Sequence, residues 1–206
     1  MKLSTIQQIC KGAKRIELYS PQDGCQWIGD GGALYPLYNL PRMDGDSIFA
    51  MFDVPEGKRD KIHLWQHTGL PENACFADCA EGEVLVETGD LEVSLGGRVL
   101  VPLITSHGAI YINKKYLLPF KDSENGIQLY ERSTSSGTVY VAVKEGFLLT
   151  GIIFPYNVVT PKFVEELETL CALSKVAMEN QKSLFGSAYE FGHEATLFGL
   201  EGSDEE

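Results

Sequence analysis

Hydrophobic and polar positions follow their clearest pattern between residues 110 and 155. Tyr116, Leu117 and Phe120 recur at helical spacing behind Asn113, a residue type that commonly caps a helix. Three runs of β-branched and aromatic residues follow, each bounded by turn residues, at positions 127–130, 138–143 and 147–154. This segment therefore predicts a short helix, a polar turn and three strands.

The first 103 residues carry shorter patterns. Ser4 to Gln7 has the S-x-x-Q form of a capping box and predicts a helix of about twelve residues, with Ile6, Ile9 and Cys10 on its apolar side. Residues 72–79 are compatible with about one or two turns of helix. Alternating runs predict strands at 16–19, 25–30, 33–38, 62–67, 83–87, 91–95 and 98–103, with hairpin turns at Gly89-Asp90 and Gly96-Gly97. The patterns together predict an α+β fold, mostly antiparallel sheet with few short helices.

The pattern changes after Pro155. Thr160 followed by Pro161 predicts a helix start, and regularly spaced apolar residues continue the helix to about Met178. Residues 180–206 are rich in glycine, serine and acidic residues, which predicts a mobile acidic tail. We therefore expect a body at 1–158, with 1–103 and 104–158 as candidate halves, an appended helix at 159–179 and a tail at 180–206.

The charge of the chain is unevenly placed. The 206 residues have a net charge of −12, with acidic residues concentrated near the C-terminus and basic residues gathered in small groups. Lys11, Lys14 and Arg15 have the spacing that places side chains on one side of the predicted helix. They form either a solvated helix face or a surface that faces phosphates, because local potential decides what a surface binds.

The element order over residues 110–155 resembles the closing half-domain of a DNA sliding clamp. The resemblance rests on N-x-x-Y-L-L at residues 113–118, a gap of about ten residues, two strands and a last strand that ends in Phe154-Pro155. The segment W-I-G-D-G-G-A-L-Y-P-L at residues 27–37 is similar to the scaffold of a clamp half-domain.

The resemblance implies a non-catalytic processivity or scaffold protein, of phage or mobile-element origin, that holds double-stranded DNA through nonspecific phosphate contacts. A chain of this size cannot encircle a duplex alone, so a homo-oligomer is implied, joined through an exposed edge strand at 152–154, with replication proteins as partners. The implied DNA-binding residues are Lys11, Lys14, Arg15, Lys114, Lys115 and Lys121.

The C-terminal segment holds two Leu-Phe pairs. Gln181, Leu184 and Phe185 form a Q-x-S-L-F string, and Leu197 and Phe198 repeat the pair. The string resembles the peptide by which replication and repair proteins dock into a bacterial sliding clamp, with the Gln on the pocket rim and the Leu-Phe pair inside. The alternative is that both pairs pack back onto the body.

A second functional hypothesis follows from this tail. The chain is then a protein-interaction module, a phage-type accessory or structural protein, that recruits a partner through its tail while the body never touches DNA. The two hypotheses differ in whether the two basic helices share one face, since divergent helices exclude encirclement of DNA.

Few residue patterns in the chain indicate metal binding or catalysis. His63, His67, Cys75 and Cys79 are residue types that bind zinc, although their spacing matches no common zinc finger, and buried thiols with surface imidazoles are the alternative. Gly29-Asp30-Gly31-Gly32 lacks the phosphate-loop signature and predicts a β-turn. A nucleophilic pair of Cys25 and His107 stays open, but no catalytic motif is present, so we expect no enzyme and no cofactor.

The remaining composition favours a cytoplasmic protein. The N-terminus becomes polar at once, unlike a signal peptide, and no apolar run approaches the roughly 20 residues of a membrane span. Five scattered cysteines fit reduced thiols better than a disulfide framework. We expect no membrane association.

Overall fold

The computed structural model describes residues 1–72, 74–123, 126–134 and 136–185. The chain divides into two compact units, Met1–Val158 and Val159–Glu206. Its described helices are α1 (Leu3–Ala13), α2 (Gly45–Met51), α3 (Glu56–Arg59), the 3-10 helix η1 (Lys114–Phe120) and, in the second unit, α4 (Pro161–Phe185). Its described strands are β1 (Arg15–Tyr19), β2 (Trp27–Gly29), β3 (Ala33–Pro36), β4 (His63–His67), β5 (Val84–Thr88), β6 (Val93–Leu95), β7 (Arg98–Thr105), β8 (Gly108–Asn113), β9 (Gln128–Ser133), β10 (Val139–Glu145) and β11 (Leu148–Ile153).

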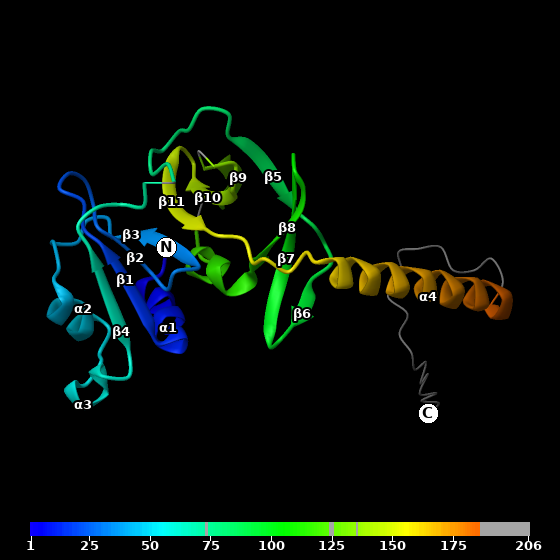
Figure 1. The fold of residues 1–206 in the computed structure, drawn as a ribbon, viewed down its shortest axis with the longest axis horizontal. Coiled ribbons are helices and arrows are strands. Elements are labelled where there is room, and N and C mark those ends of the chain that lie inside the picture. Colours follow the sequence, from blue (N-terminus) through cyan, green and yellow to red (C-terminus); the bar gives the residue numbers. More distant parts are fainter. Residues whose placement is uncertain (73, 124–125, 135, 186–206) are drawn as a thin grey trace, which may run out of the picture. The chain divides into compact units, whose positions relative to one another are not determined.

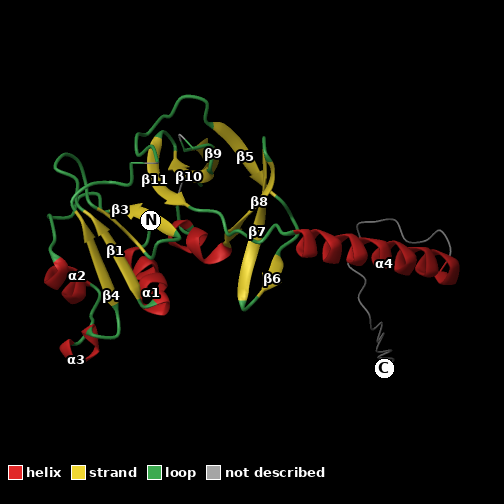
Figure 2. Cartoon of the chain, viewed as in Figure 1, coloured by secondary structure: helices red, strands yellow, loops and turns green. Residues whose placement is uncertain are grey.

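The strands of the first unit are hydrogen-bonded in the order β4-β1-β2-β3-β11-β10-β9-β5-β7-β6, and β8 pairs with β7 (Figure 2). The β1–β4 pair is parallel, whereas the other strand pairs among the described residues are antiparallel. The predicted α+β class, with mostly antiparallel sheet and few helices, is confirmed.

One motif occurs twice in the centre of this sheet. A helix precedes a three-stranded antiparallel meander in α1–β1–β2–β3 and again in η1–β9–β10–β11 (Figure 1). The two meanders meet where β3 pairs antiparallel with β11, with Leu34 opposite Ile152. The two copies therefore have the strand order expected from an approximate two-fold axis between β3 and β11.

The central strands are buried on both faces because their side chains alternate between two cores. Val141 and Val143 of β10 join the core beneath α1 and η1, which includes Ile6 and Tyr116. The alternate side chains of β10 and β11 point to the opposite face of the sheet and form a second core with Trp27. Leu70, Ala74 and Phe76 partly cover this second core. Helices α1 and η1 thus cover the same face of the sheet, and the segment after β4 covers the opposite face.

A buried ion network ties the segment between β4 and β5 to the sheet. Arg132 of β9 donates to the Glu83 carboxylate at 2.7 and 2.9 Å and to the carbonyl oxygens of Cys75, Ala77 and Asp78. Lys144 of β10 binds the other Glu83 oxygen. Five hydrogen bonds satisfy the five N–H donors of the guanidinium. We call Glu83, Arg132 and Lys144 the loop network.

The predicted elements at 110–155 are confirmed. Asn113 caps η1, since its side chain accepts a hydrogen bond from the Lys115 backbone N–H at 3.1 Å. The following strands are β9, β10 and β11, close to the predicted ranges. The edge-strand prediction for 152–154 is wrong, because β3 pairs with β11 and places this strand inside the sheet.

One prediction near the start of the chain needs correction. Helix α1 begins at Leu3, and Lys2 precedes it without a side-chain cap, so the Ser4 capping box is wrong. The Lys2 backbone N–H instead donates to the Pro119 carbonyl at 2.7 Å, which fixes the entry of the helix against η1.

The predicted hairpin turn at Gly89-Asp90 is also wrong. Both β5 and β6 pair with β7, at Leu103–Ile104 and at Arg98–Leu100 respectively, so residues 89–92 interrupt one edge instead of reversing it. The Gly89 N–H donates to the Pro102 carbonyl at 2.8 Å, and a Cβ at Gly89 would lie 2.9 Å from the Pro102 ring. Only a glycine fits this close approach without displacement of Pro102. The helix suggested at 72–79 is absent from the described residues of that segment, which form a turn, bends and irregular backbone.

Candidate functional site

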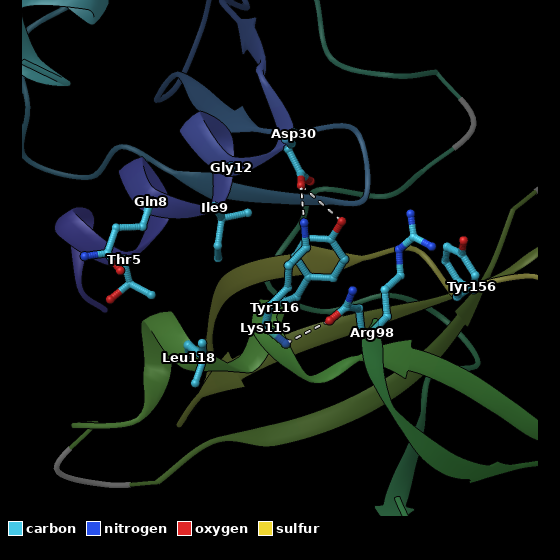
Figure 3. Close-up of a pocket in the computed structure, with 12 residues that line it drawn as sticks. Thr5, Gln8, Ile9, Gly12, Asp30, Arg98, Lys115, Tyr116, Leu118 and Tyr156 are labelled. Carbon is cyan, nitrogen blue, oxygen red and sulfur yellow. Dashed lines mark hydrogen bonds and ion pairs between the residues drawn. The ribbon is translucent and has the colours of Figure 1, made fainter. Parts of the chain in front are cut away.

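Helices α1 and η1 lie side by side on one face of the first unit. Besides the bond from Lys2 to Pro119, residues of both helices line one open cavity of about 590 Å³. The cavity is lined by Thr5, Gln8, Ile9, Gly12 and Ala13 of α1, by Asp30, Arg98, Asn113 and Tyr156, and by Lys115, Tyr116 and Leu118 of η1 (Figure 3). We call this region the helical surface.

Asp30 is the buried acid of the helical surface. Its side chain is 3% exposed and accepts hydrogen bonds from the Lys115 ammonium at 2.8 Å, from the Tyr116 hydroxyl at 3.2 Å and from the Gly32 N–H at 3.0 Å. Burial, followed by the Asp30 charge, raises the pKa of Tyr116. Tyr116 therefore stays a neutral donor, and Lys115 is held at the cavity wall with part of its charge compensated.

Arg98 supplies a second cation to the same cavity. It opens β7 directly after the Gly96-Gly97 turn, and its guanidinium lies 5.0 Å from the centre of the Tyr156 ring. In Figure 3 both side chains lie on one side of the cavity, with Lys115 and Tyr116 beside them. An aromatic face leaves the N–H donors of the guanidinium edge available to an anion. Sequence reasoning missed Arg98, Tyr156 and Gln8, because none of them belongs to a basic group or a recognisable motif.

The six predicted DNA-binding residues are only partly brought together. Lys115 lines the cavity, Lys114 lines the neighbouring hollow with Arg98, and Lys121 follows the end of η1, so we extend the name helical surface to these three lysines. Helix α1 ends at Ala13, which leaves Lys14 as a left-handed cap at φ 54° and places Arg15 in β1. The prediction that Lys11, Lys14 and Arg15 share one helical face is therefore wrong.

Acidic groups accompany most of these cations. Lys114 pairs with Glu92, Lys115 with Asp30 and Arg15 with Glu17, while Lys11 donates to the Asp53 carbonyl at 3.3 Å. Lys2, which also lies beside η1, pairs with Asp122. The helical surface is therefore mixed in charge, and a bound phosphate would compete with these carboxylates for the lysines.

Ser106, His107 and Glu131 form a cluster that resembles a catalytic triad only in composition. His107 Nδ1 lies 2.6 Å from a Glu131 oxygen and 3.0 Å from Ser106 Oγ, and the Ser106 hydroxyl donates to the same carboxylate at 2.7 Å. A triad needs the serine on one ring nitrogen and the acid on the other. Here both contacts involve Nδ1, so the arrangement stabilises the β7–β8 turn and does not activate the hydroxyl.

The Cys25 and His107 pair gains no support from the geometry. Cys25 packs beside the second core, and burial raises the pKa of its thiol, which is the opposite of what activates a nucleophile. His107 contacts Glu131 instead. All five cysteines are free.

The candidate zinc ligands lie in two different settings. His63 and His67 belong to β4, and the His67 ring stacks on Tyr19 with ring centres 4.3 Å apart. Cys75 and Cys79 are exposed in the segment held by the loop network. Within the described ranges, no three or more His, Cys, Asp or Glu side chains are grouped to hold a metal ion.

The predicted partner-binding residues lie at and beyond the end of α4. Gln181, Leu184 and Phe185 belong to α4, which extends past the predicted end near Met178, and the Gln181 side chain is exposed. Leu197 and Phe198 lie outside the described residues. The backbone at the first Leu-Phe pair is thus helical, not extended.

Comparisons with known proteins give no family. No protein-family model matches the chain, and no curated protein or solved structure matches it either. Over the described ranges, no helix has the length and apolar character needed to cross a membrane.

Proposed function

We propose that this chain is a non-catalytic, DNA-associated protein of the cytosol, similar to a sliding clamp and active as a homo-oligomer. The observation that carries the proposal is that α1 and η1 lie side by side on one face of a sheet built from two helix–meander copies. Placement of α1 and η1 on one face favours a DNA-facing surface over a body that never touches DNA, with the cations coming from η1 and Arg98, since α1 holds Lys11 alone.

The proposed interaction is with the phosphate backbone. Arg98 and Lys115 line the cavity, Lys114 lines the neighbouring hollow, and Lys121 follows the end of η1. Contacts of this kind bind DNA without sequence preference, and their affinity falls steeply with salt. The acidic partners of Lys114 and Lys115 predict weak binding by a single copy, so several copies on one duplex are required for retention.

A pair of charge-matched variants tests this function. Lys114→Gln with Lys121→Gln removes two exposed cations at the two ends of η1, and Lys58→Gln with Lys61→Gln removes two exposed cations in and beside α3. Binding to a fluorescent duplex is measured by anisotropy over a series of salt concentrations. We expect the η1 variant to lower the slope of log affinity against log salt by about 1.8, since each phosphate contact contributes about 0.9.

The α3 variant should leave this slope close to that of the unmodified protein. Equal slopes for the two variants, or no binding of the unmodified protein at low salt, would reject the proposed function.

A second candidate is the protein-interaction module. It is favoured by the carboxylates that already pair with Arg15, Lys114 and Lys115, and by the exposed Gln181 in the last turns of α4. In this case Gln181, Leu184 and Phe185 recruit a protein partner. If the folded, unmodified protein binds no DNA at any salt concentration, this second candidate remains.

A further inference from the structure

Helix α4 exposes large apolar side chains along much of its length. Val164, Leu167, Leu170, Leu173 and Val176 are 41%, 37%, 61%, 62% and 53% exposed. The helix has 25 residues, which corresponds to a length of about 37 Å. These five residues recur at every third position, so they wind around the helix, and Val164, Leu167 and Leu170 lie along one side of it. Packing of apolar side chains supplies most of the stability of a helix, so this side favours an additional partner.

The apolar residues of α4 include a seam with alternating spacings of three and four. Val164, Leu167, Cys171, Ser174 and Met178 follow this spacing, which is the pattern of a two-stranded coiled coil. The two edges beside the seam differ sharply. One edge carries Glu168 and Lys175, one heptad apart, and the other carries Leu170 and Ala177. All four residues are exposed.

The asymmetry of these edges selects both the partner and its direction. In a parallel pair of identical helices the charged edge faces the apolar edge of the partner, so Lys175 would lie against Leu170. In an antiparallel pair each edge faces its own counterpart. Glu168 then lies opposite Lys175 of the other copy, and Leu170 lies opposite Ala177, so both edges are matched.

We propose that α4 pairs with α4 of a second copy of this chain as an antiparallel two-helix coil. The two symmetric ion pairs between Glu168 and Lys175 fix the register, with its centre between residues 172 and 173. Cys171 of each copy then lies opposite Ser174 of the other copy. The inference concerns the second unit alone and does not depend on DNA binding.

Charge exchange on the full chain tests the proposal. The dimer dissociation constant is measured by sedimentation equilibrium, without DNA, for Glu168→Lys, Lys175→Glu and the double variant. Each single variant places like charges opposite each other twice, so we expect about a tenfold weaker dimer. The double variant restores opposite charges and should return the dissociation constant to within about threefold of the original.

Glu179→Lys is the matched control, because it makes the same charge change at an exposed position away from both edges. It should leave the dissociation constant unchanged. Circular dichroism checks that every variant keeps its helix content.

Three results would overturn the proposal. A monomer at tens of micromolar shows that α4 is solvated or covered by residues of its own chain. Single variants with unchanged dimerisation show a parallel pair or a contact elsewhere. A double variant as weak as the single variants shows that Glu168 and Lys175 are not opposite each other.

Discussion

The loop network and the helical surface both contain acid–base pairs, but water reaches them very differently. Arg132 and Lys144 keep only 2% and 4% of their side-chain exposure while both bind Glu83. On the helical surface, Lys114 and Glu92 are 51% and 41% exposed. Buried charges lose hydration that only complete pairing recovers, whereas exposed pairs contribute little and exchange partners easily. Cations of the loop network are therefore structural, and only those of the helical surface are available to a ligand.

The largest expected effect comes from removing the acid of each set in turn. Glu83→Gln leaves two buried cations without a counter-charge, and we expect a loss of about 3–5 kcal/mol in the free energy of unfolding. Glu92→Gln removes an exposed acid, and the expected loss is below about 1 kcal/mol. Urea denaturation at neutral pH measures both. Similar losses for the two variants would remove the distinction between the sets.

The stability that the loop network contributes should decrease as the pH falls. Burial raises the pKa of Glu83, but hydrogen bonds from Lys144 and Arg132 outweigh burial and hold the pKa below the ordinary value of 4.5. A carboxyl with a lowered folded-state pKa stabilises the fold above its unfolded pKa, and this contribution is lost as the pH falls. The difference between the original protein and Glu83→Gln should therefore shrink below about pH 4.5.

Much of the fold was predictable because its strands carry strong local signals. The runs of β-branched residues in β9, β10 and β11 stand between turn residues, and Asn113 marks the start of η1. Pairings between distant segments were not predictable. The parallel β1–β4 pair and the insertion of β3 against β11 depend on which edges remain open after collapse, and no local pattern encodes that.

The candidate site was predicted only where it follows a local pattern. Lys114 and Lys115 stand next to a recognisable helix start, so their shared position was evident from spacing. Asp30 and Arg98 are 68 positions apart, and Asp30 stands in a glycine-rich turn that carries no functional motif. Both reach the cavity through the tertiary fold. The error for Lys14 and Arg15 arose because the left-handed residue at the end of α1 leaves no mark on hydrophobic spacing.

Gly32→Ala tests the packing around the Asp30–Lys115 ion pair. The exposure of this pair lies between that of the loop network and that of the Lys114–Glu92 pair. A Cβ at Gly32 would lie 2.0 Å from the Tyr116 hydroxyl oxygen, so Gly32→Ala must displace Tyr116 from Asp30. We expect a loss of about 2–3 kcal/mol in the free energy of unfolding, as for overpacked cores. Gly57→Ala is the control, because nothing lies within 4 Å of its added methyl group. Thermal unfolding of both variants measures the difference, and equal midpoints would contradict the close contact at Gly32.

Asp30→Asn changes the same pair by charge alone. The Asp30 side chain is 3% exposed and that of Lys115 is 34% exposed, so the pair lies between the two sets of the comparison. We expect a loss of about 2 kcal/mol in the free energy of unfolding, less than for Glu83→Gln, because Lys115 can turn toward water. Under the proposed function, the released Lys115 also raises the affinity for duplex DNA at low salt, measured by anisotropy. Unchanged stability with unchanged DNA affinity would show that Asp30 neither holds nor restrains Lys115.

Among the acids with little exposure, the smallest effect is expected for Glu131, whose partner His107 is exposed. Its side chain is 4% exposed, whereas that of His107 is 59% exposed. Burial raises the pKa of Glu131, but hydrogen bonds from the backbone and hydroxyl of Ser106, and then from His107, lower it overall. Glu131→Gln keeps an acceptor for Ser106, so we expect a loss of only about 1 kcal/mol in the free energy of unfolding near neutral pH.

This loss should diminish as the pH falls below the ordinary carboxyl value of 4.5, because the lowered folded-state pKa stabilises the fold only while Glu131 is ionised. Urea denaturation of the original protein and Glu131→Gln, at neutral pH and near pH 3, measures the change. A loss that stays constant with pH would assign the stability to the shape of the β7–β8 turn. The charge of a buried acid would then matter only where its cations are buried as well, as they are around Glu83.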